Sequence, residues 1–241
     1  MIRQCIAAVL TGALATASMA QTAPATDWPT KPVRLVVPYA PGGTSDTLGR
    51  LIAQHLQTAL KQNVVVDNRG GGGGTIGSLQ VAKAAPDGYT LVVSGIGSHV
   101  IAPVEIGSFN PMTDFTHIAM LGGPPLVLAV HPSLGVNSLR ELIAYAQRTK
   151  GGYSWGSPGQ GTHGHLIGEL LAQRANIPHT HLAYKGAAPA IQDLVAGQIP
   201  VTLTTYTSAN AFIKTGQIKA LALTSPKRLA ELPDVPTFAE L

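Results

Sequence analysis

The fold of this chain is most constrained by two glycine-containing turns, residues 41–46 and 156–162. Each turn follows an apolar run typical of a strand and precedes a helical pattern. Each is therefore expected to present backbone N–H groups at a helix N-terminus, where they attract anions. Neither turn contains Lys, Arg or a plausible nucleophile–base pair. Glycine also serves ordinary tight turns, but two equivalent turns in one chain favour a protein that binds an anion without transforming it.

The first twenty residues have the pattern of a secretory signal. Arg3 gives the positive start, residues 6–14 give the short apolar stretch, and cleavage is predicted after Ala20. The apolar stretch is too short to span a bilayer. Cys5 is the only cysteine and lies in this segment, so the mature chain is expected to enter an oxidising compartment without disulfides.

Composition indicates a globular protein and gives no sign of a nucleic-acid partner. The hydrophobic content is 45% and the charged content only 12%, as in a compact domain rather than a disordered chain. The formal net charge of +4 is small and dispersed, and aromatic residues make up 5%. Both values are too low for a surface that binds nucleic acid.

The N-terminal half alternates strand and helix patterns, which predicts a parallel sheet. Helical spacing follows the first turn, where Thr44, Ser45 or Asp46 is expected to be the N-cap. A second helix is expected after the glycine run at residues 70–74. The predicted strands of this half are residues 33–37, 64–66 and 89–93.

A second α/β unit begins near Leu126. The capping box formed by Ser138 and Glu141 opens its first helix, and Pro200 restricts its own strand to a sheet edge or a strand start. The two halves thus share an architecture, and ligands bind in clefts between such units. The predicted strands are residues 126–130, 153–156, 180–184, 199–203 and 218–224, and the later helices are residues 189–196 and 209–214.

Two sequence patterns associated with enzymes are present, but the other residues that each pattern requires are not in the expected places. Residues 72–77 match the glycine pattern of dinucleotide-binding proteins, but the following strand does not end in the acidic residue that this pattern requires. Residues 152–156 match the nucleophile elbow around Ser154. No Asp lies between Ser154 and the last histidine, His181, and the only acidic residue there, Glu169, sits on the helix after the next loop, so the order that an α/β-hydrolase needs is not met. The sequence therefore predicts that the chain is not an enzyme.

Four histidines lie near one another in the sequence: His163, His165, His179 and His181. Residues two apart on a strand share a face, so His179 and His181 could hold one metal ion. No cysteine supports them and no carboxylate alternates with them. Structural or cleft-lining histidines are favoured, so no metal and no other cofactor is predicted. A receptor that binds a metal stays open as an alternative.

Several motifs are spread over the chain from Trp28 to Leu241: WPxKPxR from Trp28, PYAPGGTSD from Pro38, VVVDNR from Val64, APDGYT from Ala85, YKG from Tyr184 and LPDVPT from Leu232. Taken as a set, these motifs resemble one family, the Bug-type receptors. These are the TctC-like substrate-binding proteins of tripartite tricarboxylate transporters.

The resemblance implies a two-domain α/β periplasmic binding protein of type II, a Venus flytrap, that is monomeric and not inserted in the membrane. It implies that a small organic carboxylate binds in the interdomain cleft and passes to the permease subunits of a tripartite tricarboxylate transporter. A signalling protein as the partner stays open. The residues expected to bind the ligand are Tyr39, Gly42, Gly43, Thr44, Asp46, Ser157, Gly159, Gly161, Thr162, His165, Tyr184, Thr204 and Thr205.

The expected domain limits follow from the same resemblance. A first domain is expected over residues 21–124, a second over 125–219, and a return segment towards the first domain over 220–241. Because members of the family continue past this point, the C-terminal part of the first domain is expected to be missing.

Two departures from the family pattern bear on the site. Pro158 stands where a small hydroxyl residue is usual, which removes one N–H donor from the second turn. Thr204 and Thr205 stand where acidic or amide residues are common, so a carboxylate without a cationic group is the expected ligand.

Overall fold

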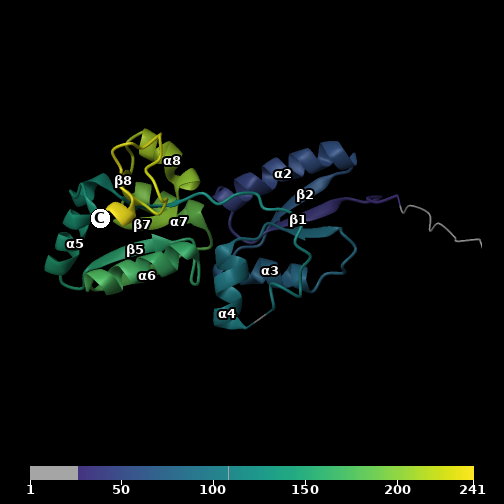
Figure 1. The fold of residues 1–241 in the computed structure, drawn as a ribbon, viewed down its shortest axis with the longest axis horizontal. Helices are drawn as coiled ribbons and strands as arrows, with labels where there is room; N and C mark the ends of the chain where they lie inside the picture. Colours follow the sequence, from purple (N-terminus) through teal and green to yellow (C-terminus); the bar gives the residue numbers. More distant parts are fainter. Residues whose placement is uncertain (1–26, 108) are drawn as a thin grey trace, which may run out of the picture. The chain divides into compact units, whose positions relative to one another are not determined.

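The computed structural model describes residues 27–107 and 109–241. The predicted signal segment, residues 1–20, lies outside the described residues. Lys31–Leu241 form one compact unit, which contains both β-sheets of the protein (Figure 1). None of the helices in the described ranges combines the length and the apolar character needed to cross a bilayer.

The first sheet has three parallel strands in the order β2–β1–β3. Because β1 is the central strand and helices cover the sheet, four of its five residues are buried. The parallel sheet with its crossover helices confirms the order expected from the sequence. The elements are β1 (Val33–Val37), α2 (Thr44–Leu60), β2 (Val64–Asn68), η1 (Gly72–Gly74), α3 (Thr75–Ala82) and β3 (Thr90–Val92).

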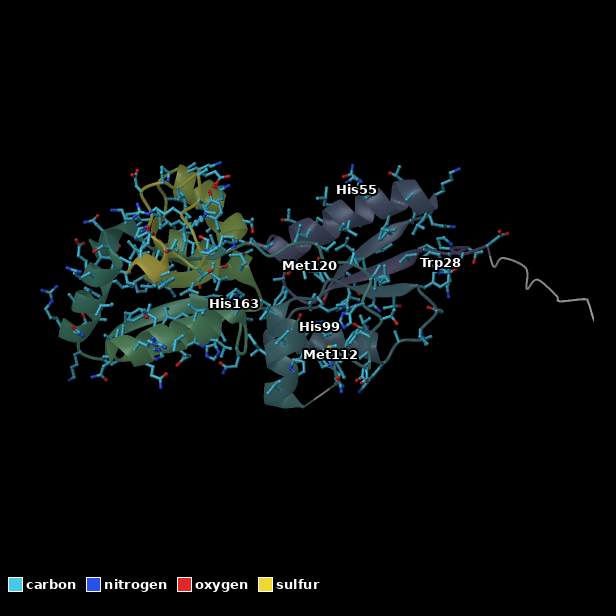
Figure 2. All side chains as sticks on the ribbon, viewed as in Figure 1. Trp28, His55, His99, Met112, Met120 and His163 are labelled. Carbon is cyan, nitrogen blue, oxygen red and sulfur yellow. The ribbon has the colours of Figure 1, made fainter. Side chains whose placement is uncertain are left out.

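An apolar stretch with many exposed side chains connects the two sheets. It contains η2 (Gly97–Ile101) and α4 (Ala102–Ile106). Met112 and Met120, which Figure 2 labels, belong to it. Its exposed large apolar residues are Ile96, Val100, Val104, Met112, Ile118, Met120 and Leu121.

The second sheet has five strands in the order β6–β5–β7–β4–β8 and is mixed. β5 runs parallel to β6 and β7, whereas β4 runs antiparallel to β7 and β8. The two sheets are therefore less alike than the sequence predicted, because β4 fills the space between β7 and β8 in the opposite direction. The strands are β4 (Leu126–Val130), β5 (Tyr153–Ser157), β6 (His179–Ala183), β7 (Val201–Thr205) and β8 (Lys219–Leu223).

Helices cover both faces of the second sheet (Figure 1). One core cluster gathers around Trp155 and Leu142, and the other around Ile191 and Leu194. Leu229, Leu232 and Val235, which follow β8, also pack on the second cluster. The helices are α5 (Leu139–Arg148), α6 (His163–Ala175), α7 (Ala187–Val195) and α8 (Tyr206–Lys214), and the short turns are η3 (Pro132–Leu134) and η4 (Phe238–Glu240).

The structure decides between the two positions expected for Pro200 and modifies the expected capping box of α5. Pro200 immediately precedes β7, a central strand, so it occupies the strand start and not a sheet edge. Ser138 caps α5 by accepting the N–H of Glu141, but the Glu141 carboxylate accepts the N–H of Asn137, so the capping box forms on one side only. The expected domain limits stay predictions, and the limit after residue 219 falls within β8.

Candidate functional site

The first glycine turn leads from β1 into α2. Gly43 is the N-cap of this helix, with an extended backbone and no side-chain cap. The residues expected to cap it, Thr44, Ser45 and Asp46, lie in the first helical turn instead, because the helix begins directly after Gly43. Gly42 has a φ of +88°, which glycine adopts without strain.

Asp46 fastens this turn to its surroundings. The residue is 4% exposed. Its carboxylate accepts hydrogen bonds from the backbone N–H of Gly42 (3.0 Å), the guanidinium of Arg50 (3.0 Å) and the side-chain amide of Asn68 (2.9 Å). Burial alone raises the pKa of Asp46, but the three hydrogen bonds outweigh burial and lower it below its ordinary value. Asp46 is therefore an anion that holds the turn in place.

Thr44 connects the start of α2 to the start of α8. Its backbone N–H donates to Ser208 Oγ at 3.0 Å, and its Oγ1 lies 2.7 Å from Thr205 Oγ1 and 3.0 Å from Ser208 Oγ. Thr207 Oγ1 also contacts Thr44 Oγ1. We call Thr44, Thr205, Thr207 and Ser208 the hydroxyl cluster. It joins residues that are more than 160 positions apart in the sequence.

The second glycine turn leads from β5 into α6, and its N–H groups have acceptors within the protein. The N–H of Gly159 donates to Ser157 Oγ, and that of Gly161 donates to His165 Nδ1, both at 3.2 Å. Thr162 is the N-cap of α6 and accepts the N–H of His165, while its own hydroxyl donates to Gly159 O at 2.7 Å. An oxyanion can bind these N–H groups only if they change partners.

Loops from the two sheets meet at Gly73. The Tyr39 hydroxyl donates to Gly73 O at 3.0 Å, and burial raises the pKa of Tyr39 to about 12. A Cβ on Gly73 would lie only 2.2 Å from Gln160 O in the second turn. Close by along the first loop, the N–H of Ala40 donates to Lys185 O at 2.8 Å. The loop after β2 therefore touches the loop after β5, and the loop after β1 touches the loop after β6.

Two of the expected site residues, Tyr184 and Thr204, have hydroxyl groups that lie outside the hydroxyl cluster. The hydroxyl of Tyr184 donates to Asp193 Oδ2 in α7 at 2.6 Å. Burial, with this hydrogen bond, raises the pKa of Tyr184 to about 12. Thr204 is fully buried in β7, and its Oγ1 has no hydrogen-bond partner among the described residues. Neither residue belongs to the hydroxyl cluster.

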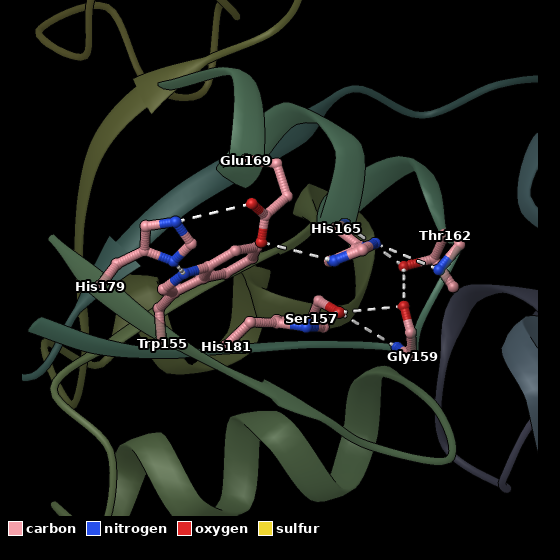
Figure 3. Close-up of polar contacts among 9 residues, drawn as sticks. Trp155, Ser157, Gly159, Thr162, His165, Glu169, His179 and His181 are labelled. Atoms are coloured by element: carbon pink, nitrogen blue, oxygen red, sulfur yellow. Dashed lines mark hydrogen bonds and ion pairs between the residues drawn. The ribbon is translucent and has the colours of Figure 1, made fainter. Parts of the chain in front are cut away.

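Three histidines and a glutamate form a network beside the second turn, and Figure 3 shows Glu169 between two of the histidine rings. Glu169 Oε1 lies 3.5 Å from His165 Nε2, and Oε2 lies 3.5 Å from His179 Nε2. His181 stacks on His165 with ring centroids 4.2 Å apart, and its Nε2 lies 2.7 Å from Ser157 Oγ. Burial, with the nearby His165 and His179, lowers the pKa of His181 to about 4.

Part of this network has the spacing of a metal site. His165, Glu169 and His181 each place one ligand atom within 4.8 Å of the others. However, Nδ1 of His165 accepts the N–H of Gly161, so the proton of this imidazole lies on Nε2. A histidine ligates a metal through a free nitrogen lone pair. His165 has none while it holds Gly161, and the network therefore fits hydrogen bonding better than metal binding.

Thr207 and Ser208 contact Thr44 in the hydroxyl cluster but were not among the residues that the sequence predicted for the site. They lie in the first turn of α8, directly after β7, which is the same strand-to-helix position that the two glycine turns occupy. This turn contains no glycine, so a glycine-based pattern does not find it. Its position in the α/β order is the signal that could have found it.

Comparison with known proteins decides the family. Residues 48–241 match the family TctC, described as tripartite tricarboxylate transporter family receptor. This chain belongs to that family. Protein BugT of Bordetella pertussis is 36% identical over 235 residues, which cover 95% of this chain and 71% of BugT. A UPF0065 protein from Pseudomonas sp. is 37% identical over 219 residues, 88% of this chain, and the chain spans only 64% of that relative.

Solved structures agree with the family. A Rhodopseudomonas palustris protein solved with adipate is 37% identical with a TM-score of 0.84, and the match covers 88% of this chain and 72% of that one. MatC of the same organism, with bound malate, is 32% identical with a TM-score of 0.83 and covers 88% and 73%. The periplasmic binding protein BugD is 34% identical with a TM-score of 0.81 and covers 88% and 72%. The TctC-family chain described here thus has the expected two-domain α/β fold of a substrate-binding receptor, and it is not an enzyme.

Proposed function

We propose that this TctC-family chain is a periplasmic receptor for a small organic carboxylate. The ligand binds where the turns of the two sheets meet, and the receptor delivers it to the permease of a tripartite tricarboxylate transporter. The hydroxyl cluster at the start of α2 and α8 carries this proposal. Family membership supports it, as do the two related structures that hold malate and adipate.

The chemistry of this place suits a carboxylate. The first turns of α2 and α8 supply partial positive charge from N–H groups that no carbonyl of the same helix accepts, and this charge stabilises an anion without a counter-ion. The four hydroxyls of the cluster bond to one another, and each can rotate to donate to an oxyanion instead. Two or three charge-assisted hydrogen bonds, with apolar burial, account for a dissociation constant of about 1 μM, or about −8 kcal/mol.

Calorimetric titration of the purified chain with malate and with adipate tests the proposal. We expect micromolar binding of at least one of these acids and none of its uncharged diamide. Thr44→Val removes a hydroxyl from the cluster and should weaken binding at least about tenfold, which corresponds to about 1.4 kcal/mol.

Thr58→Val is the matched control. Thr58 lies on an exposed part of the same helix, and its hydroxyl bonds to Gln54 O one turn away. It should leave the affinity unchanged. Equal affinity of the Thr44 and Thr58 variants would remove the hydroxyl cluster from the site, and no binding of any small carboxylate by the unmodified chain would contradict the proposed function.

A further inference from the structure

The same hydrogen-bonding arrangement stabilises both glycine turns. In the first turn, the N–H of Gly42 donates to the side chain of Asp46, and in the second, the N–H of Gly161 donates to the side chain of His165. In both, the acceptor lies four residues after the glycine, on the third residue of the following helix. Both glycines have positive φ, +88° and +67°.

The two acceptor side chains, Asp46 and His165, respond differently to pH. Asp46 has a lowered pKa, so it accepts the N–H of Gly42 throughout the neutral range. His165 accepts the N–H of Gly161 only while Nδ1 carries no proton. A proton on Nδ1 breaks this hydrogen bond and frees the Gly161 N–H.

The surroundings of His165 contain one group that balances a new positive charge. Glu169 lies 3.5 Å from His165 Nε2, so the added proton would face a carboxylate on the same helix. His181, which stacks on His165, has its pKa lowered to about 4 and stays neutral. Among the described residues, the titratable groups around His165 are His163 and Glu169 on α6, His179 and His181 on β6, and Tyr153 on β5.

We propose that the second turn binds the ligand carboxylate together with a proton. His165 takes up the proton on Nδ1, the Gly161 N–H turns from His165 to a carboxylate oxygen, and Glu169 faces the resulting imidazolium. His165 and Glu169 are positioning residues that act through Gly161. This inference rests on the proposed function, because it concerns the same ligand.

The experiment measures carboxylate affinity and proton uptake together. Malate and adipate are titrated calorimetrically into the purified chain between about pH 6 and pH 8.5, in buffers of different ionisation enthalpy. Carboxyl groups ionise near pH 4 and stay charged over this range, so a change in affinity comes from the protein. We expect affinity to rise as pH falls, approaching about tenfold per pH unit, with uptake of up to one proton.

The variant His165→Asn distinguishes a positioning role of His165 from a purely structural one. The Asn oxygen can accept the Gly161 N–H at the place of Nδ1 but cannot gain a proton there. This variant should bind with a nearly pH-independent affinity and no proton uptake. His55→Asn, an exposed histidine on α2 (Figure 2), is the matched control and should keep the slope of the unmodified chain.

A ligand-free measurement covers the case in which His165→Asn does not fold. In the unmodified chain, the amide NMR signal of Gly161 should move with the titration of the His165 ring. A Gly161 amide signal that does not change as the His165 ring titrates overturns the inference. A folded His165→Asn variant whose affinity depends on pH as steeply as that of the unmodified chain also overturns it. Carboxylate binding whose affinity does not vary with pH overturns it while leaving the proposed function in place. Failure to bind any carboxylate at every pH contradicts both.

Discussion

Asp46 and His165 share one feature at the scale of single residues: each was predicted to bind the ligand, and each accepts a glycine N–H within its own turn in the ligand-free structure. The sequence located both turns because glycine between a strand and a helix is a local signal. The sequence could not show which acceptor the N–H groups bind, because the side chain four residues after each glycine competes with the ligand for them. That competition depends on the rotamer and the neighbours of each side chain.

Asp46→Asn tests the structural role of this carboxylate. The Asn side chain keeps one acceptor oxygen but cannot accept all three hydrogen bonds, so the free energy of unfolding in urea should fall by about 1–3 kcal/mol at pH 7. The native pKa of Asp46 is lowered. Its stabilisation is therefore present above the unfolded-state pKa of about 3.9 and is lost as pH falls through the lower native pKa. The difference between the two proteins should shrink only below about pH 4.

Asp234→Asn is the control for this substitution. Asp234 lies exposed in the segment that follows β8, and its replacement should change the free energy of unfolding by no more than about 0.5 kcal/mol. A loss at Asp46 no larger than the loss at Asp234 would show that the three hydrogen bonds stabilise little.

Whole elements were predicted well where their signal is local. The bounds of β1 and β4 agree with the predicted strands, because a β-branched or apolar run between turn residues has few other conformations. The start of α2 was wrong, because a glycine N-cap has no side chain to mark it. The direction of β4 was not predicted, since direction depends on pairing with β7 and β8, which follow it by more than 70 residues.

The packing of α6 on β5 gives a prediction at the scale of elements. Gly168 lies in the middle of α6, and an added Cβ would meet the ring of Trp155 at 2.1 Å. Alanine favours a helix over glycine by about 1 kcal/mol, so Gly168→Ala would stabilise an isolated α6. In this protein it should instead lower the free energy of unfolding by about 1–3 kcal/mol, because helix and strand must move apart.

Gly123→Ala is the matched control for the packing of α6. A Cβ at Gly123 meets nothing within 4 Å, so this variant should unfold at nearly the denaturant concentration of the unmodified chain. A Gly168→Ala protein as stable as the unmodified one would mean that α6 does not depend on this close approach.

At the scale of the whole molecule, the site depends on contacts that no local pattern encodes. Gly73 belongs to a five-glycine run that partly matches the sequence pattern of nucleotide-binding proteins. In the structure, the missing side chain of Gly73 leaves room for the backbone oxygen of Gln160. The hydroxyl cluster likewise joins the first sheet to the second through Thr44 and Ser208. Sequence patterns predicted a binding region at the ends of the strands, but the residues that meet there come from segments far apart in the chain.

Gly73→Ala tests whether this approach of the loops serves binding. Gly73 has a φ of +63°, and Gly135 has a similar φ of +72° but open space around it. Alanine in this left-handed conformation costs roughly 1–2 kcal/mol at either position, so both variants should lose stability in urea, and Gly73→Ala should lose more because its Cβ would lie 2.2 Å from Gln160 O. Only Gly73→Ala places a Cβ against Gln160 O, so only this variant should also weaken malate or adipate binding, by at least about tenfold. Equal affinities in the two variants would mean that the ligand binds without the contact between Gly73 and the second turn.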